Sequence, residues 1–226
     1  MSEQRVGVVV AAGTGERFGH DLPKAFVRLG DESLLVRSCQ VMRQVCGRLV
    51  VVVGDDWRSQ AGHMLASAGI KAWICGGGAT RTDSVAAGLA ACETLEPSDL
   101  VGIHDAARPL ASAALISRVF AAVRDGWDAA APGLPVVDTL KLVGEDGAVV
   151  RTVDRGRLWT VQTPQVFRWA ALARAYQVPD QATDDLGLVE RIGCRVRLIM
   201  GESTNLKITY RQDLELAEAL LGRGCS

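Results

Sequence analysis

The strongest constraint on the fold is a repeated alternation of short apolar runs with segments of helical spacing. Predicted strands cover residues 5–10, 48–53, 70–75 and 100–104, and helical patterns cover 34–45, 58–68, 83–95 and 112–125. Continuous β-branched runs are typical of strands buried on both faces. Strands joined through helices run parallel, and right-handed crossovers leave helices on both faces of the sheet. The chain is therefore predicted to be an α/β protein with a doubly wound, mostly parallel sheet.

A β-hairpin is predicted where this alternation changes. A predicted strand at 128–131 stops at the Pro132-Gly133-Leu134-Pro135 segment, and two β-prone runs then flank an Asp146-Gly147 turn. Asp-Gly between two such runs is typical of a hairpin. Because a hairpin has no place in a parallel sheet and exposes strand edges, residues 136–153 are predicted to form a projecting arm that serves in dimerisation.

The C-terminal segment predicts an amphipathic helix. Thr209 and Gln212 have the spacing of a capping box ahead of several helically spaced apolar residues. No internal repeat or interdomain linker interrupts the 226 residues. Since α/β folds of this length commonly remain one unit, residues 1–226 are predicted to form a single domain.

Charge and cysteine content argue against several classes of function. The 25 basic and 26 acidic side chains leave a formal charge of −1, so no global charge favours binding to nucleic acid or to an anionic membrane. Apolar runs are broken well before the ~20 residues that a membrane helix needs. The six cysteines form no C-x-x-C pair, which predicts reduced thiols in a cytoplasmic protein. Any anion must therefore be bound by a local site.

A glycine-rich loop follows the first predicted strand and has two cations near it. It reads A-A-G-T-G-E-R from Ala11 to Arg17, and Pro23-Lys24 comes shortly after. Glycines let the backbone turn its N–H groups toward a phosphate, and Arg17 and Lys24 add positive charge. An ordinary βα turn is the alternative, and the two cations favour phosphate binding over it. The spacing matches neither the dinucleotide G-x-G-x-x-G motif nor a Walker A loop, so both nucleotide folds are disfavoured.

Two further motifs stand at the carboxyl ends of predicted strands, where ligands bind in open α/β sheets. The first runs from Gly76 to Val85, and the second reads H-D-A-A-R-P from His104 to Pro109. Asp105 can reach a Mg²⁺ ion on a polyphosphate, and Arg108 can clamp a phosphate oxygen. The structural alternatives are helix capping in the first motif and a local salt bridge between Asp105 and Arg108.

The remaining polar motifs are weaker one by one, since each could be surface or capping chemistry. His104 is predicted to be a packed histidine, and three scattered histidines argue against a zinc site. No Ser/His/Asp set or Cys/His pair indicates nucleophilic catalysis. The weaker motifs are Thr139, Asp154-Arg155, Thr163-Pro164-Gln165, Thr183-Asp184-Asp185 and Asn205-Leu206-Lys207-Ile208-Thr209.

In their order along the chain, these motifs resemble those of one enzyme family. The A-A-G-x-G-x-R loop with its Pro-Lys is similar to the nucleotidyltransferases that activate sugars and polyols. G-G-x-x-R-x-x-S-V, H-D-A-A-R-P, V-D-R, T-P-Q, T-D-D and N-x-K-I-T resemble the 2-C-methyl-D-erythritol 4-phosphate cytidylyltransferases. The resemblance implies a Rossmann-like nucleotidyltransferase fold and transfer of CMP from CTP to methylerythritol phosphate, releasing pyrophosphate on the route to isoprenoids. It also implies Mg²⁺ or another divalent cation, and a homodimer.

The resemblance implies a role for each matching residue. The first loop would cradle the triphosphate, the second would read cytosine, and Asp105 would touch both metal and acceptor. The implied catalytic residues are Arg17, Lys24, Arg155 and Lys207, and the implied nucleotide-binding residues are Ala11, Ala12, Gly13, Gly15, Gly78, Ala79, Arg81, Ser84, Asp105 and Ala106. The implied acceptor-binding residues are Asp105, Arg108, Thr139, Thr163, Thr183, Lys207 and Arg155, the last reaching from the hairpin of a second subunit.

Two positions depart from the usual pattern of this family. Ala25 stands where relatives often have Gln, and Ala79 stands where they often have an acidic residue. Backbone contacts at Ala79 would survive the change, whereas a side-chain contact would not. The alternatives are a ribitol 5-phosphate cytidylyltransferase, a sugar-1-phosphate nucleotidyltransferase with another base, and a non-catalytic nucleotide-binding module. Arg17, Lys24 and Lys207 argue against the last of these.

Overall fold

A mixed, mostly parallel sheet of eight strands organises the computed structural model, which describes residues 3–13, 22–92, 94–178 and 184–222. The strand order is β10-β7-β11-β6-β1-β4-β5, and β12 pairs with β7. β1, β4, β5 and β6 are parallel neighbours, whereas β10 and β11 run antiparallel to their partners. The strands are β1 (Arg5–Val10), β4 (Arg48–Val53), β5 (Trp73–Gly76), β6 (Leu100–Asp105), β7 (Ala129–Pro135), β10 (Trp159–Val161), β11 (Gln165–Arg168) and β12 (Val196–Met200).

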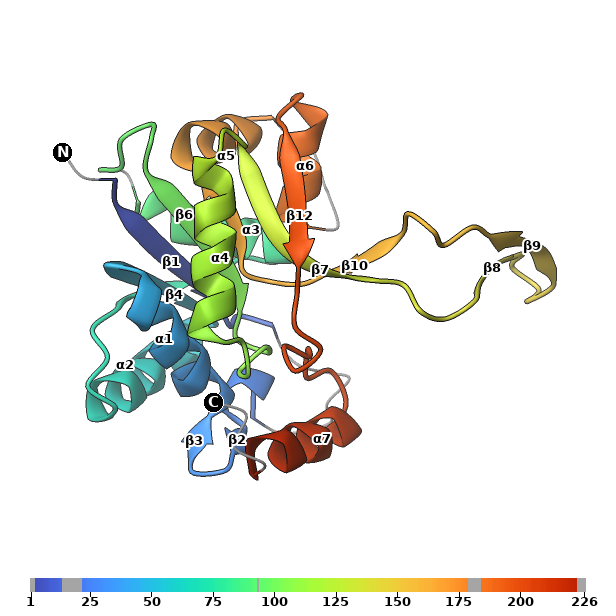
Figure 1. The fold of residues 1–226 in the computed structure, drawn as a ribbon. Coiled ribbons are helices and arrows are strands. Elements are labelled where there is room, and N and C mark those ends of the chain that lie inside the picture. Colours follow the sequence, from blue (N-terminus) through green and yellow to red (C-terminus); the bar gives the residue numbers. More distant parts are fainter. Residues whose placement is uncertain (1–2, 14–21, 93, 179–183, 223–226) are drawn as a thin grey trace.

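Helices cover both faces of this sheet (Figure 1), so the doubly wound prediction is confirmed. One core contains Val9 and Val51 and packs against α1, α2 and α4, and the other contains Val8 and Val50 and packs against α3, α5 and α6. Side chains alternate across a strand, which explains why neighbouring valines belong to different cores. The helices are α1 (Leu34–Val45), α2 (Arg58–Ser67), α3 (Arg81–Ala90), α4 (Ala113–Arg124), α5 (Trp169–Ala175), α6 (Asp185–Arg191) and α7 (Arg211–Gly222), with short 3₁₀ turns η2 (Lys24–Phe26) and η3 (Asp55–Trp57).

The bounds of β5 and α3 differ from the predicted ones, because local turns and caps compete with the hydrophobic pattern. β5 begins later than predicted, since the amide of Ile70 donates to the Leu65 carbonyl (2.8 Å) and closes the end of α2. α3 begins and ends earlier than the predicted 83–95. Thr80 and Asp83 form a capping box that starts this helix.

The predicted end of a strand before Pro132 is wrong, because β7 continues to Pro135. Proline removes one amide donor from a strand but keeps its carbonyl. The carbonyl of Pro132 accepts from the amide of Gln162 (2.8 Å). Pairing with β10 and β12 therefore carries the strand through the prolines.

The C-terminal helix α7 is capped by a residue other than the one predicted. The helix begins at Arg211, and the carboxylate of Asp213 accepts from the amides of Thr209 and Tyr210, both at 2.7 Å. The predicted capping box of Thr209 with Gln212 is therefore wrong. The helix packs against the small hairpin of β2 (Arg28–Leu29) and β3 (Glu32–Ser33).

An arm projects from the body of the protein (Figure 1). Its strands β8 (Leu140–Val143) and β9 (Val149–Val153) pair with each other in a separate two-stranded sheet. They lie within residues 136–153, for which the sequence predicts a hairpin, although the first strand starts later than predicted. Val137 and Val149 are 78% and 61% exposed. Apolar side chains on an isolated hairpin are typical of an interaction surface.

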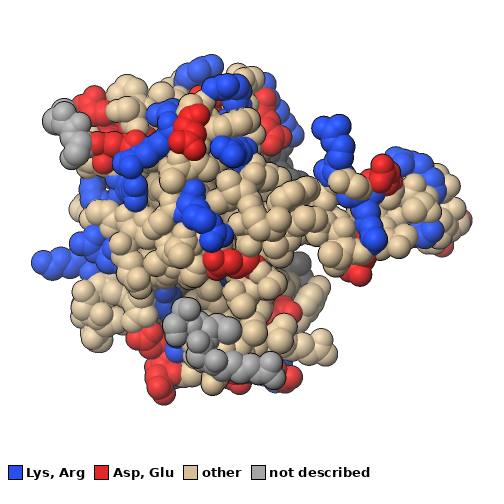
Figure 2. All heavy atoms as spheres, viewed as in Figure 1, with Lys and Arg blue, Asp and Glu red and all other residues tan. Residues whose placement is uncertain are grey.

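The surface of the body has no region dominated by one sign of charge on the face in Figure 2, in agreement with the net charge of −1. Within the described ranges, no helix is long and apolar enough to cross a membrane. The five cysteines in those ranges are free thiols, and Cys39, Cys46 and Cys92 are buried. Cys225 lies outside the described residues.

Candidate active site

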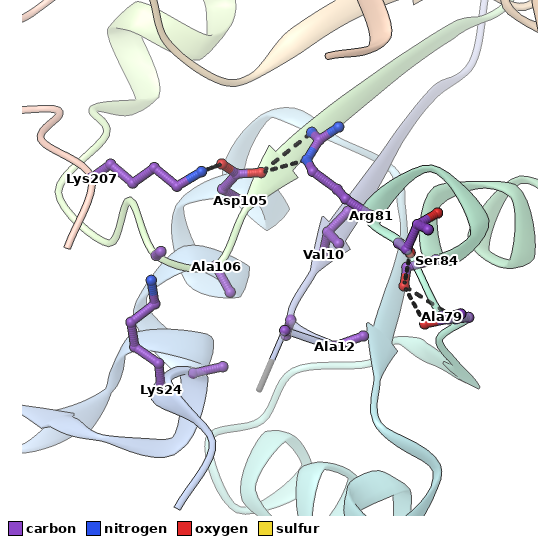
Figure 3. Close-up of a pocket in the computed structure, with 15 residues that line it drawn as sticks. Val10, Ala12, Lys24, Ala79, Arg81, Ser84, Asp105, Ala106 and Lys207 are labelled. Atoms are coloured by element: carbon purple, nitrogen blue, oxygen red, sulfur yellow. Dashed lines mark hydrogen bonds and ion pairs between the residues drawn. The ribbon is translucent and has the colours of Figure 1, made fainter. Parts of the chain in front are cut away.

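A cavity of about 510 Å³ opens at the carboxyl ends of β1 and β6, beside the start of α3. This edge is where an open α/β sheet binds its ligands. The three motifs that the sequence places at strand ends contribute to its walls, together with Lys24 and Lys207 (Figure 3). The lining residues are Val10, Ala11, Ala12, Gly13, Lys24, Ala25, Gly78, Ala79, Thr80, Arg81, Ser84, Asp105, Ala106, Ala107 and Lys207.

The two glycine loops lie against each other. A Cβ atom added to Gly77 would come within 2.4 Å of the Cβ of Ala12, so this close approach requires glycine. Ser84 shapes the second loop, because its hydroxyl accepts from the amide of Gly78 (3.1 Å) and donates to the carbonyl of Thr80 (2.9 Å). The capping alternative is also correct for Asp83, which bonds the amide of Thr80. Capping and cavity lining are therefore compatible in this motif.

Asp105 is the last residue of β6, and its carboxylate lies between two cations (Figure 3). Lys207 Nζ is 2.7 Å from Oδ2, while Arg81 Nε and Nη2 are 3.4 and 3.3 Å from Oδ1. Burial would raise the pKa of this carboxyl, but the charges of Arg81 and Lys207 outweigh burial and hold the pKa well below its ordinary value. Asp105 is therefore a carboxylate at neutral pH.

The alternative of a local Asp105–Arg108 salt bridge does not describe this site. Arg108 Nη1 donates to the carbonyl of Asn205 (2.7 Å) and Nη2 to that of Val161 (3.4 Å). The guanidinium thus ties together backbone segments beside the cavity.

Arg81 is held by two residues whose role the sequence analysis missed. Its Nη1 pairs with Asp185 at 2.8 Å, and the hydroxyl of Tyr176 donates to the other oxygen of Asp185 at 2.6 Å. Burial raises the pKa of Asp185 above its ordinary value, although Arg81 and Tyr176 favour the charged form. The adjacent Asp184 is the helix cap, since it accepts from the amide of Gly187 (3.0 Å). Only one of two successive aspartates can serve as this cap. The sequence therefore indicated that the other aspartate of the pair has a different role, which the structure shows to be the ion pair of Asp185 with Arg81.

The main chain of Asp105 is held by Thr163, which in turn contacts His104. The Thr163 hydroxyl accepts from the amide of Asp105 and lies 3.1 Å from His104 Nδ1, while Nε2 lies 3.1 Å from the carbonyl of Arg108. Because a carbonyl can only accept, Nε2 carries the proton and Nδ1 accepts from the Thr163 hydroxyl. His104 is fully buried, as predicted, and burial lowers its pKa to about 4.

The neutral, buried His104 predicts a loss of stability in mild acid. Its pKa in the fold lies below the ordinary value of 6.5, so the unfolded chain binds this proton more readily. The stabilisation of the folded state by the neutral imidazole of His104 is complete above pH 6.5 and is lost as the pH falls toward 4. We expect His104 to lower the free energy of unfolding by about 2 kcal/mol between pH 7 and pH 5.

Urea unfolding of the wild type and of a His104→Asn variant at both pH values measures this contribution. The drop in unfolding free energy from pH 7 to pH 5 should be smaller in the variant by that amount. An equal drop in both proteins would contradict the assignment.

Several predicted site residues lie away from the cavity or outside the described residues. Thr139 and Arg155 are exposed on the arm, where the Arg155 guanidinium donates to the carbonyl of Val137. Thr163 is buried behind Asp105. Gly15, Arg17 and Thr183 lie outside the described residues.

Comparison with known proteins identifies the family. The family model for 2-C-methyl-D-erythritol 4-phosphate cytidylyltransferase matches residues 6–223. A relative of that name from Rhodococcus jostii is 46% identical over 97% of this chain and 96% of its own, and one from Saccharopolyspora erythraea is 45% identical over 96% and 98%. The crystal structure of 2-C-methyl-D-erythritol 4-phosphate cytidylyltransferase from Thermus thermophilus is 36% identical over 95% of this chain and 98% of that chain, with a TM-score of 0.77. The chain therefore belongs to the 2-C-methyl-D-erythritol 4-phosphate cytidylyltransferases, the nucleotidyltransferases of isoprenoid biosynthesis that transfer CMP from CTP to that acceptor.

Proposed function

We propose that CTP and methylerythritol phosphate meet in this cavity and that its residues act by alignment and charge neutralisation. The observation that carries the proposal is the carboxylate of Asp105 between Arg81 and Lys207, with Lys24 on the wall of the same cavity. The acceptor phosphate is already an anionic nucleophile, so the transfer needs no general base. Cations that align two anions and neutralise developing charge are then sufficient.

The two glycine loops are proposed to bind CTP. In the first, the backbone from Ala11 to Gly13, continued by Gly15, would cradle the triphosphate with its N–H groups. In the second, Gly78, Ala79 and Ser84 would read cytosine. The Ser84 hydroxyl fixes the backbone of this loop at Gly78 and Thr80. Because the side chain of Ala79 is a methyl group, contact with cytosine at that position would come from the backbone.

The proposed chemistry is a single displacement at phosphorus. An oxygen of the acceptor phosphate forms a bond to the α-phosphorus of CTP, and the bond from that phosphorus to the bridging oxygen of the β-phosphate breaks. Pyrophosphate leaves with the electron pair of the broken bond. Arg17 and Lys24 are proposed to stabilise the charge that develops at the α-phosphate, and Lys207 to hold the acceptor phosphate beside Asp105.

A divalent cation fits the donors that the cavity offers. In the described ranges, no group of three or more His, Cys, Asp or Glu side chains could enclose a metal. Mg²⁺ commonly binds through one or two carboxylates together with substrate phosphates, and Asp105 supplies one carboxylate on the cavity wall. We propose that Asp105 and the triphosphate hold Mg²⁺, which would supply charge neutralisation. Lys207 would have to release Oδ2 of Asp105, or share it, when the ion binds.

The acceptor pocket is proposed to be completed by a second subunit. Thr139 and Arg155 lie on the projecting arm, whereas the lining of the cavity comes from the body of the protein. A homodimer would bring the arm of one subunit to the cavity of the other and cover its exposed valines. Arg108, Thr163 and Thr183 are proposed to complete the acceptor side. We also propose a cytoplasmic location, which agrees with a CTP-dependent reaction and free thiols.

Substrate choice tests the proposal directly. Pyrophosphate release is measured with CTP, ATP, GTP and UTP, each with methylerythritol phosphate or ribitol 5-phosphate as acceptor. We expect release with CTP and methylerythritol phosphate to exceed every other combination. Preference for ribitol 5-phosphate would overturn the proposed acceptor pocket, and preference for another nucleotide would overturn the cytosine-reading role of the second loop.

Loss of Lys207 should mainly impair use of the acceptor. A hydrogen bond between charged groups contributes about 1.5–3 kcal/mol, so we expect Lys207→Ala to raise KM for methylerythritol phosphate by about tenfold or more. KM for CTP should change much less, and Thr183→Ala should behave similarly. Lys71→Ala, at an exposed lysine outside the cavity, is the control. A rise in KM for CTP alone would contradict this division of the cavity.

A further inference from the structure

Lys207 reaches Asp105 from a segment that has no helix or strand of its own. The segment runs from the end of β12 at Met200 to the start of α7 at Arg211. The Lys207 side chain is 43% exposed, and a long, exposed lysine is not expected to keep one position by itself. The 2.7 Å contact with Asp105 therefore depends on what holds this segment in place.

Asn205 is a buried residue of this segment whose side chain and backbone both bond to other parts of the chain. It is completely buried, and its Nδ2 donates to the carbonyl of Thr163 (2.9 Å) and to Oε1 of Gln162 (3.3 Å). Its backbone carbonyl accepts from Arg108 Nη1 (2.7 Å), and its amide donates to the carbonyl of Glu202 (3.0 Å). One asparagine thus joins the segment that carries Lys207 to two other parts of the chain.

Both of those parts also support Asp105. Thr163 accepts the amide hydrogen of Asp105 through its hydroxyl, and Arg108 follows Asp105 in the turn after β6. On the other side of Lys207, the amide of Ile208 donates to the carbonyl of Ala107 (2.8 Å), and Ile208 is completely buried. Lys207 therefore lies two residues after one anchor and directly before another, and both anchors are fixed to the surroundings of Asp105.

The orientation of the Asn205 side-chain amide is set by the groups that face it. Its Oδ1 atom is buried, and none of the described residues donates a hydrogen bond to it. The orientation of the amide follows from its surroundings, because the two facing atoms, Thr163 O and Gln162 Oε1, both accept. Among the described residues, the side chain is therefore held through its two donated bonds.

We propose that Asn205 is a positioning residue that sets Lys207 against Asp105. The proposal rests on the role proposed above for Lys207 in binding the acceptor phosphate. Removing the Asn205 amide frees one anchor of the segment, so the ammonium group of Lys207 spends less time at the carboxylate. Because Asn205 does not line the cavity, it must act on the reaction through other residues, and the proposal assigns that action to Lys207 rather than to Thr163 or Arg108.

Chemical labelling of lysine tests the positional part without any substrate. The chain has four lysines, Lys24, Lys71, Lys141 and Lys207, so acetylation rates measured by mass spectrometry follow each of them in one sample. An amine held by a carboxylate reacts slowly because it must first leave its partner. In Asn205→Ala, we expect Lys207 to be labelled several times faster relative to Lys71 and Lys141. An unchanged relative rate would overturn the proposal.

Asp99→Ala is a control for the loss of two side-chain hydrogen bonds at a buried residue. Asp99 is 2% exposed and accepts from the amides of Gln4 and Glu96, each at 2.8 Å, next to the opposite end of β6. This variant should lose stability without changing the relative labelling of Lys207. Acceleration of Lys207 labelling in it as well would assign the effect to general loosening, against the proposal. If Asn205→Ala does not fold, Asn205→Ser, with one short donor, takes its place with the same expectations.

A double-mutant cycle tests the functional part. We expect Asn205→Ala to lower kcat/KM for methylerythritol phosphate about tenfold in the wild-type background and much less in the Lys207→Ala background. If the two substitutions lowered kcat/KM in the double variant by the product of their separate effects, Asn205 would act independently of Lys207, which would overturn the proposal. If Lys207→Ala alone had wild-type kinetics, the proposed role of Lys207 would fail instead, while the labelling result would still decide whether Asn205 positions it.

Discussion

Replacing Lys24 with alanine is expected to lower kcat by about 100-fold or more while the Kd for CTP changes much less. Lys24 begins η2 and lines the cavity on the side of Ala106, across from Ala79 and Ser84 (Figure 3). A cation there can face negative charge that is greatest in the transition state, so its loss affects turnover more than ground-state binding. Arg17→Met should have the same effect, although Arg17 lies outside the described residues.

Single-turnover kinetics and equilibrium binding of CTP separate the two quantities. Lys71→Ala is a matched control, because Lys71 is exposed and does not line the cavity. Its kcat should equal that of the wild type. A Lys24→Ala variant that binds CTP weakly but turns over normally at saturation would limit Lys24 to ground-state binding and remove it from the proposed catalytic group.

The part of the fold that could be predicted from the sequence is the part buried on both faces. β1, β4 and β6 lie between two cores, so most of their residues are apolar and the pattern is visible in the local sequence. Parallel pairing places the loops after these strands at one edge of the sheet. The cavity between the two glycine loops and Asp105 follows from that arrangement.

Strands that depend on distant partners could not be predicted in this way. β10, β11 and β12 are short, and their pairing with β6 and β7 brings together segments far apart in the chain. The prolines of β7 are an example, since Pro132 reads locally as a break. Its carbonyl nevertheless bonds Gln162, a partner that no local pattern identifies.

The residues of the candidate site differ in the same way, since some could be predicted from the local sequence and others depend on distant contacts. Asp105 could be predicted because it ends a buried strand in a recognisable motif. The residue that fixes its partner Arg81 could not, because Asp185 is 104 residues from Arg81 in the chain. Asn205 likewise belongs to a motif found in the sequence, but its contacts with Thr163 and Arg108 appear only in the fold. Spacing indicates which residues reach a cavity and does not indicate which residues hold them there.

Mixing two variants that are each inactive alone is expected to restore part of the activity. Arg155 and Thr139 lie on the projecting arm, and the cavity is lined from the body of the chain, so a trans contribution requires the arm to extend to a partner (Figure 1). Exposed Val137 and Val149 give the arm an apolar surface that a partner would cover. Lys24→Ala damages the cavity of its own chain, and Arg155→Ala would damage the cavity of the partner.

In a heterodimer of these two variants, one site would carry both substitutions and the other would carry neither. Random mixing of equal amounts makes half of the dimers mixed, so roughly a quarter of all sites should regain activity. If Arg155 served its own cavity, every site would retain one lesion. Native mass spectrometry first establishes that subunits have exchanged. Full exchange without recovered activity would then exclude a trans role for Arg155, and a preparation that is monomeric at assay concentrations would exclude the dimer as well.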